Sequence, residues 1–163
     1  MKAAVYTQYG APEVLHLQEV AKPTPKANEI LVRVRATPVN YGDLLARNFG
    51  NVSAREFNMP FLLWFPTKFV FGLQKPKKPI LGSEFAGDVA DGGQDVKQFK
   101  VGDPVFGYRG PSMGANAEYL CVPETSIIAP KPATMTYEEA ATIPYGALTA
   151  LSLLRKVNLQ PGQ

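Results

Sequence analysis

Proline and glycine recur so closely along this chain that most of it has room only for short strands and turns. The 163 residues include 14 glycines and 15 prolines, and both residue types end strands and interrupt helices. Strand-like segments lie between them at residues 1–5, 14–18, 30–36, 83–89, 104–108 and 117–122. In one of these, Val32 and Val34 alternate with two arginines, which predicts one buried and one exposed face. The pattern predicts a mainly β domain, with a short helix at 41–48 that ends before Gly50.

The chain changes character near residue 134. Thr136 and Glu139 have the spacing of a capping box, which predicts the start of a helix. Pro144 is expected to interrupt that helix, and a second helix is expected from about Tyr145 to Val157. The second helix is apolar nearly all round and would need to be buried. We therefore divide the chain into a β domain at 1–133 and a helical connector at 134–163, which ends in a turn at 158–163.

Residues 51–79 interrupt the β pattern, and we call them the aromatic insert. They hold five of the nine phenylalanines and the only tryptophan, Trp64. A spacing of four predicts helical turns, although Pro66 is expected to limit any one helix; the spaced residues are Phe61, Phe65 and Phe69. Three interpretations stay open: the wall or lid of a substrate pocket, packing against the β domain or a partner subunit, and, least favoured, contact with a membrane surface. The third interpretation rests on flanking lysines, which are Lys68, Lys75, Lys77 and Lys78.

Charge and cysteine content narrow the class of protein. The net charge is +3, and the basic cluster at residues 75–78 favours a solvated loop, so we expect no nucleic-acid partner. Cys121 is the only cysteine, which excludes an intrachain disulfide and favours a reducing compartment. Because no signal-peptide pattern opens the chain, we expect a cytoplasmic protein. We expect His16 on the surface and Cys121 as an inert buried thiol.

Three segments together resemble the medium-chain dehydrogenase/reductase superfamily. They are PVNYGD at 38–43, LGSEFAG at 81–87 followed by VGDPVFG at 101–107, and ATIPYGALTA at 141–150 with LQPG at 159–162. The resemblance covers the chain except for the aromatic insert. It implies a mainly β (α+β) fold, a GroES-like partly open β-barrel. It also implies C-terminal helices that would lead into a Rossmann domain absent from this chain.

The resemblance also bears on zinc. Zinc-dependent members carry Cys, His or carboxylate ligands at positions that match Asn40, Ser83 and Tyr145, and none of these three is a good ligand for zinc. The loop of four cysteines that holds structural zinc is also missing. The chain therefore resembles the zinc-independent branch of quinone oxidoreductases and enoyl reductases, and we expect no metal site.

The candidate catalytic residues are those that could stabilise the negative charge that develops on a carbonyl oxygen as it gains hydride. Tyr41 and Tyr145 offer hydroxyl groups and Asn40 offers an amide. In the resemblance, Asn40 lies near the nicotinamide and Thr149 beside the cofactor, so we count both as cofactor-binding candidates. Plainer roles stay open: Asn40 as a helix cap, Thr149 bonded back to a helix carbonyl, and the tyrosines as packing residues.

Two acidic residues near these positions could form an acid/base pair. We favour a structural role for Asp43 and Glu84, with Arg47 or Arg109 as partners.

The resemblance implies the substrate-side domain of an oxidoreductase. The intact enzyme would transfer hydride from NADPH, or NADH, to a quinone or an α,β-unsaturated carbonyl without zinc. Its partners would be its own Rossmann domain and a small apolar carbonyl or quinone, and we expect a homo-oligomer without membrane contact. Because the chain holds no Gly-x-Gly-x-x-Gly turn, we expect it to bind NAD(P)H weakly and to be inactive alone. The alternative is a free-standing GroES-like binding module with no catalysis.

Overall fold

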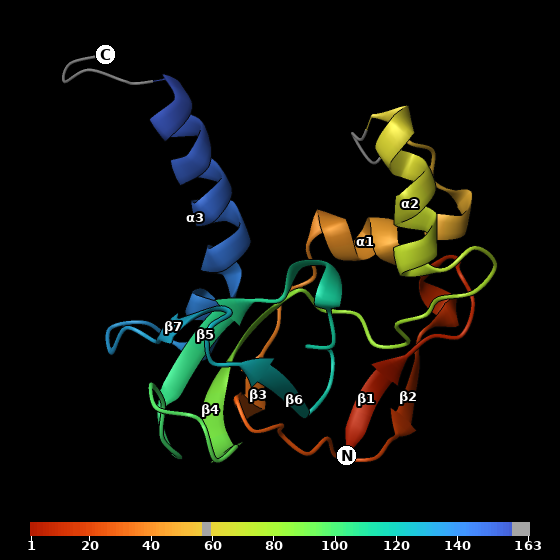
Figure 1. Cartoon of the computed structure of the whole chain (residues 1–163). Coiled ribbons are helices and arrows are strands. Elements are labelled where there is room, and N and C mark those ends of the chain that lie inside the picture. Colours follow the sequence, from red (N-terminus) through yellow and green to blue (C-terminus); the bar gives the residue numbers. More distant parts are fainter. Residues whose placement is uncertain (57–59, 158–163) are drawn as a thin grey trace.

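The computed structural model describes residues 1–56 and 60–157, which fold around one curved antiparallel sheet (Figure 1). Its strands lie in the order β6-β3-β4-β5-β7. Their bounds are β3 (Glu29–Ala36), β4 (Glu84–Gly92), β5 (Pro104–Tyr108), β6 (Tyr119–Pro123) and β7 (Ile127–Pro130). A separate antiparallel pair is formed by β1 (Lys2–Val5) and β2 (His16–Glu19). The predicted mainly β fold is confirmed; the edge strand β7 was not predicted. Phe57 and the turn expected at 158–163 lie outside the described residues.

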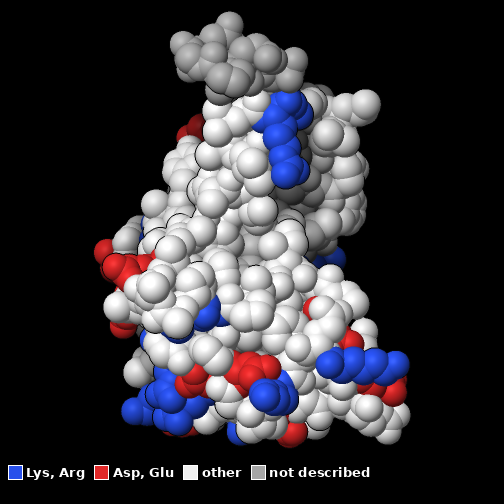
Figure 2. Space-filling view, turned by 90° about the vertical axis from the view of Figure 1, so that its left-hand side faces the viewer, with Lys and Arg blue, Asp and Glu red and all other residues white. Residues whose placement is uncertain are grey.

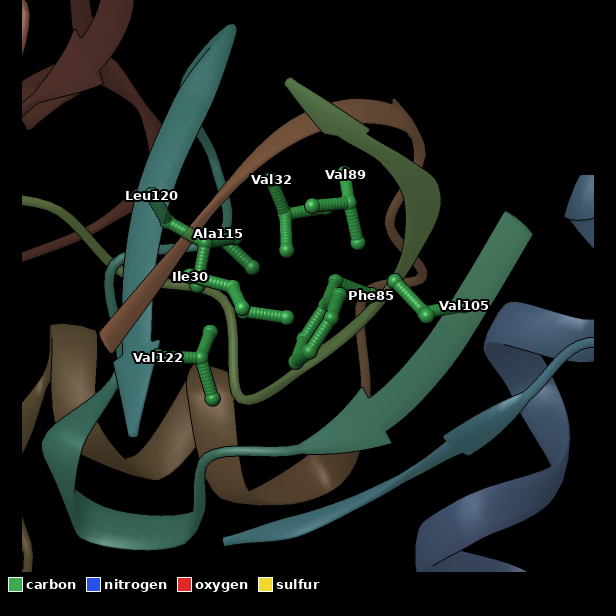
Figure 3. Close-up of a cluster of buried hydrophobic side chains, with 8 residues drawn as sticks. All are labelled: Ile30, Val32, Phe85, Val89, Val105, Ala115, Leu120 and Val122. Atoms are coloured by element: carbon green, nitrogen blue, oxygen red, sulfur yellow. The ribbon is translucent and has the colours of Figure 1, made fainter. Parts of the chain in front are cut away.

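Aliphatic side chains around Phe85 fill the inside of the curved sheet (Figure 3). Ile30 and Val32 of β3 are buried in this core, whereas the two arginines of the same strand are exposed, as the alternation predicts. Gly87 of β4 lies so close to β3 that a Cβ atom there would come within 2.1 Å of the Arg33 carbonyl oxygen. Glycine alone permits this approach, which holds β3 and β4 together at the centre of the sheet.

Two helices, α1 (Tyr41–Arg47) and α2 (Phe61–Phe71), lie together above one side of the sheet (Figure 1). Pro66 lies inside α2, so the expectation that it would limit the helix is wrong. An internal proline costs a helix about 3 kcal/mol, and tertiary packing compensates for it here. Trp64 and Phe71 of α2 are buried against Phe49, with ring centroids 4.9 and 4.8 Å from the Phe49 ring. Short 3-10 turns occupy Pro12–Val14, Phe49–Asn51 and Gly110–Ser112.

The third helix, α3 (Tyr137–Val157), is continuous, so the predicted interruption at Pro144 is wrong. The predicted capping box is confirmed. The Glu139 amide donates to Thr136 Oγ1 over 3.2 Å, and the Thr136 amide donates to Glu139 Oε2 over 2.8 Å. The first turns of α3 pack onto the sheet through Ala140 and Ala141, which contact Ala86 of β4.

The rest of α3 projects away from the sheet (Figure 1). Every side chain from Tyr145 to Val157 is exposed, including Leu148, Leu151, Leu153 and Leu154. Figure 2 shows this side of the molecule: charged side chains gather over the sheet, and most of the surface above it is uncharged. None of the described helices is long and apolar enough to cross a membrane.

Candidate active site

A cavity of about 550 Å³ lies between α1, α2, the start of β4 and the middle of α3. Helix α2 supplies one wall through Thr67 and the apolar Val70 and Phe71, and the polar groups Asn40 and Ser83 also line the cavity. The full lining is Asn40, Tyr41, Gly42, Leu45, Glu56, Thr67, Val70, Phe71, Ser83, Tyr108, Gly110, Pro111, Met113 and Tyr145. The cavity therefore brings together three of the four predicted site residues and the aromatic insert.

Asn40 is the residue at which the polar groups of the site meet. It is the N-cap of α1, where its Oδ1 atom accepts a hydrogen bond of 3.1 Å from the Asp43 amide. Its Nδ2 atom donates to Ser83 Oγ over 2.7 Å and to Glu84 Oε2 over 2.9 Å. A side-chain amide has two N–H donors, and both are used here. The capping role is confirmed, and donation to a substrate, which stays a prediction, would require one of these bonds to open.

Glu84 connects Asn40 to helix α3. Its carboxyl group is buried, and its Oε1 atom accepts a hydrogen bond of 2.7 Å from the Tyr145 amide, directly after Pro144. The two carboxyl oxygens thus bind one group from α1 and one from α3. Asn40 also binds Ser83, so the three positions compared above with zinc ligands, Asn40, Ser83 and Tyr145, lie close together and line the same cavity.

Asp43 is the second buried carboxyl group. Burial raises its pKa, and hydrogen bonds from the Asn40 amide, the Ser83 side chain and the Gly82 amide partly offset that rise. The expected arginine partners of the two acids are wrong. Arg47 donates to the Gly10 carbonyl oxygen, and Arg109 donates to the carbonyl oxygens of Met113 and Cys121. Neutral amide and hydroxyl groups therefore hold both acids, which fits the structural role that the sequence favours.

Three tyrosines border the cavity. Tyr41 and Tyr145 were predicted from the sequence, and their side chains are 61% and 41% exposed. Tyr108, at the end of β5, was not predicted; its ring lies 5.8 Å from that of Tyr145. Burial, followed by the electrostatic effect of Tyr145, Glu84 and Asp43, raises the pKa of Tyr108. The turn of glycines after Tyr108 was the signal that could have identified it, since residues beside such turns often form sites.

Thr149 lies one turn beyond Tyr145 and outside the main cavity. Its hydroxyl group donates to the Tyr145 carbonyl oxygen over 2.7 Å, which confirms the local helix bond. It lines a smaller hollow of about 380 Å³ together with Tyr108, Tyr145 and Leu148. A contact with a cofactor stays a prediction.

Three further expectations concern a metal site, the cysteine Cys121 and the histidine His16. In the described ranges 1–56 and 60–157, no three His, Cys, Asp or Glu side chains lie close enough together to hold a metal ion. Cys121 is partly buried, and burial raises the pKa of its thiol, as expected of an inert cysteine. His16 is exposed on β2.

A family model identifies the class of domain that this fold and site define. Residues 26–133 match the alcohol dehydrogenase GroES-like domain. The match covers more than half of the chain, which therefore belongs to this family, within the medium-chain dehydrogenase/reductase superfamily.

Individual relatives are oxidoreductases. The chain is 32% identical, over its whole length, to 39% of the 2-methylene-furan-3-one reductase of Solanum lycopersicum. It superposes on a quinone oxidoreductase from Coxiella burnetii with a TM-score of 0.79 and 30% identity, covering 99% of this chain and 46% of that one. It superposes on the Escherichia coli quinone oxidoreductase complexed with NADPH with a TM-score of 0.75 and 28% identity, covering 96% of this chain and 41% of that one. The chain thus spans less than half the length of these relatives.

Proposed function

We propose that this chain is the substrate-side domain of an NAD(P)H-dependent oxidoreductase that reduces a quinone or an α,β-unsaturated carbonyl without zinc. The observation that carries the proposal is a hydrogen-bonded cluster beside a largely apolar cavity: Asn40 donates to Ser83 and to the Glu84 carboxylate, which also accepts from the Tyr145 amide. Relatives that are quinone and enone reductases support the reaction class.

The chemistry of these groups suits hydrogen bonding better than metal binding. Asn40 Oδ1 is occupied by the Asp43 amide, and its NH₂ group donates to Ser83 and Glu84. Neither arrangement directs a free lone pair at a zinc ion, which needs deprotonated thiolate, imidazole or carboxylate ligands.

A nicotinamide cofactor supplies the hydride, and this domain supplies the pocket and the polarisation of the substrate. The negative charge that forms on the substrate oxygen requires hydrogen-bond donors, and three tyrosines that line the cavity, Tyr41, Tyr108 and Tyr145, are candidates. Val70 and Phe71 of α2 provide an apolar wall for a flat, lipophilic substrate. We propose Asn40 and Thr149 as contacts on the cofactor side.

The exposed apolar surface of α3 favours this function over a free-standing binding module. Four leucines of α3 are exposed, and a second hollow of about 290 Å³, lined mostly by apolar residues, lies between α3 and β7. Each such side chain gains roughly 1.5–3 kcal/mol when it is fully buried. We propose that residues 134–163 connect to a nucleotide-binding domain that covers this surface.

The test is a steady-state assay of the protein that joins this domain to its nucleotide-binding domain. We expect NADPH-dependent reduction of small quinones and enones, and no comparable oxidation of simple alcohols with NADP⁺. Single Tyr41→Phe, Tyr108→Phe and Tyr145→Phe variants identify the donor as the one whose loss lowers kcat more than it raises KM. Alcohol oxidation with no quinone or enone reduction would refute the proposal.

A further inference from the structure

Helix α2 has two apolar faces, and only one of them is covered by the protein. The inner face is buried through Trp64 and Phe71. On the outer face, Leu62, Phe65 and Phe69 are 85%, 67% and 50% exposed, at the three- and four-residue spacing that aligns side chains along one helix face. The rings of Phe65 and Phe69 lie 5.5 Å apart, so they form one continuous apolar ridge.

Several contacts fix the outer face in solvent. The Tyr9 hydroxyl group is 2.8 Å from the Phe71 carbonyl oxygen and 2.9 Å from that of Gly72. Lys77 Nζ donates to the Phe69 carbonyl oxygen over 2.7 Å. The end of α2 is thus anchored to the domain, and the inner face cannot be exchanged for the outer one without breaking these bonds.

The segment around α2 is predominantly basic. The segment from Arg55 to Lys78 holds five of the chain's 17 basic residues and one of its 14 acidic residues, Glu56. The chain carries a net charge of +3, so without this segment it would be slightly acidic. The Glu56 carboxylate accepts hydrogen bonds from the amide and hydroxyl groups of Ser53. Lys77 lies beside the ridge through its bond to the Phe69 carbonyl oxygen, Arg55 and Lys75 are exposed, and Lys68 lies over the Trp64 ring. An apolar ridge on a segment with an excess of basic residues is complementary to an anionic lipid surface.

We propose that the outer face of α2 docks onto an anionic lipid bilayer, with the helix lying in the interface. This was the least favoured interpretation of the aromatic insert from the sequence, and the geometry of α2 changes that weighting. A second copy of the chain is a poorer occupant, because two α2 ridges facing each other would bring their own lysines together. The proposal does not depend on the reaction proposed above.

Vesicle flotation tests this proposal with the chain itself. We expect binding to vesicles of phosphatidylcholine mixed with phosphatidylglycerol, and much weaker binding to phosphatidylcholine alone. A ridge variant, Leu62→Ser/Phe65→Ser/Phe69→Ser, should lose at least tenfold in partitioning. A matched control, Leu148→Ser/Leu151→Ser/Leu154→Ser, removes exposed leucines of α3 and should bind as the parent does. Neutralising the exposed Arg55 and Lys75 with glutamine should weaken binding about fivefold for each residue.

The outcomes separate the possible occupants of the ridge. Urea unfolding first confirms that each variant is folded. Equal binding to neutral and anionic vesicles, equal losses in the ridge variant and the α3 control, or no vesicle binding would each overturn the proposal. It would also be overturned if the ridge variant changed the sedimentation coefficient of the free chain without changing vesicle binding, because that result would assign the ridge to a second copy.

Discussion

Replacing Glu84 by glutamine tests whether this carboxylate holds the two sides of the site together. Its two oxygens accept hydrogen bonds from Asn40 Nδ2 and from the Tyr145 amide, over 2.9 and 2.7 Å. Glutamine has nearly the same shape but only one acceptor oxygen, so its NH₂ group must face one of the two donors. One hydrogen bond is lost and one buried donor is left unpaired, which costs about 2 kcal/mol, within the range of roughly 1–3.

Urea unfolding measures this cost. Glu84→Gln should lower the free energy of unfolding by about 2 kcal/mol, and the midpoint of thermal unfolding by roughly 4–8 °C for a chain of this size. Glu13→Gln, at an exposed glutamate, is the matched control and should leave both quantities unchanged. Hydrogen exchange at the Tyr145 amide and the NMR signals of the Asn40 NH₂ group would show which bond is lost. If Glu84→Gln were as stable as the control, the bridging role of Glu84 would be refuted.

Three further predictions follow from the packing and charge of the site. Because burial raises the pKa of Asp43, the folded chain binds this proton more tightly than the unfolded chain, and stability falls as the pH rises from about 4 through the raised pKa. Asp43→Asn should remove this fall, measured by urea unfolding at a series of pH values. Trp64→Ala should cost about 3–5 kcal/mol because it opens a void beneath α2, whereas Phe65→Ala on the outer face should cost less than about 0.5 kcal/mol; equal losses would contradict the two-faced packing of α2. Calorimetric titration of the chain with NADPH should detect no tight binding, and stoichiometric tight binding would show that the expected dependence on a second domain is wrong.

The elements that local sequence rules describe were predicted well. The alternation of valine and arginine in β3, the Asn40 cap and the Thr136–Glu139 capping box each depend on residues within a few positions of one another. Such short-range patterns need no knowledge of the rest of the fold.

The two internal prolines show what local rules could not provide. Pro66 and Pro144 were expected to limit or interrupt helices, yet α2 and α3 run through them. In α3, the amide that follows the proline donates to Glu84, a residue 61 positions earlier in the chain. In α2, burial of Trp64 compensates for the local cost. Both compensations come from long-range contacts, which one sequence alone does not show.

Long-range contacts also explain why the partners of Asp43 and Glu84 were predicted wrongly and why Tyr108 was missed. The sequence brought the right acids to attention, but it could not show that Asp43 and Glu84 are held by neutral groups rather than by arginines. Tyr108 was missed because the only local signal is the turn that follows it, and its contact with Tyr145 of α3 is a long-range one.

We propose that this domain supports hydride transfer without a metal ion. The most direct test is metal analysis of the protein that joins this domain to its nucleotide-binding domain, combined with NADPH-dependent quinone reduction before and after treatment with a chelator. We predict no stoichiometric zinc and an unchanged kcat after chelation. One zinc ion per chain, together with loss of activity on chelation that added zinc restores, would contradict the claim.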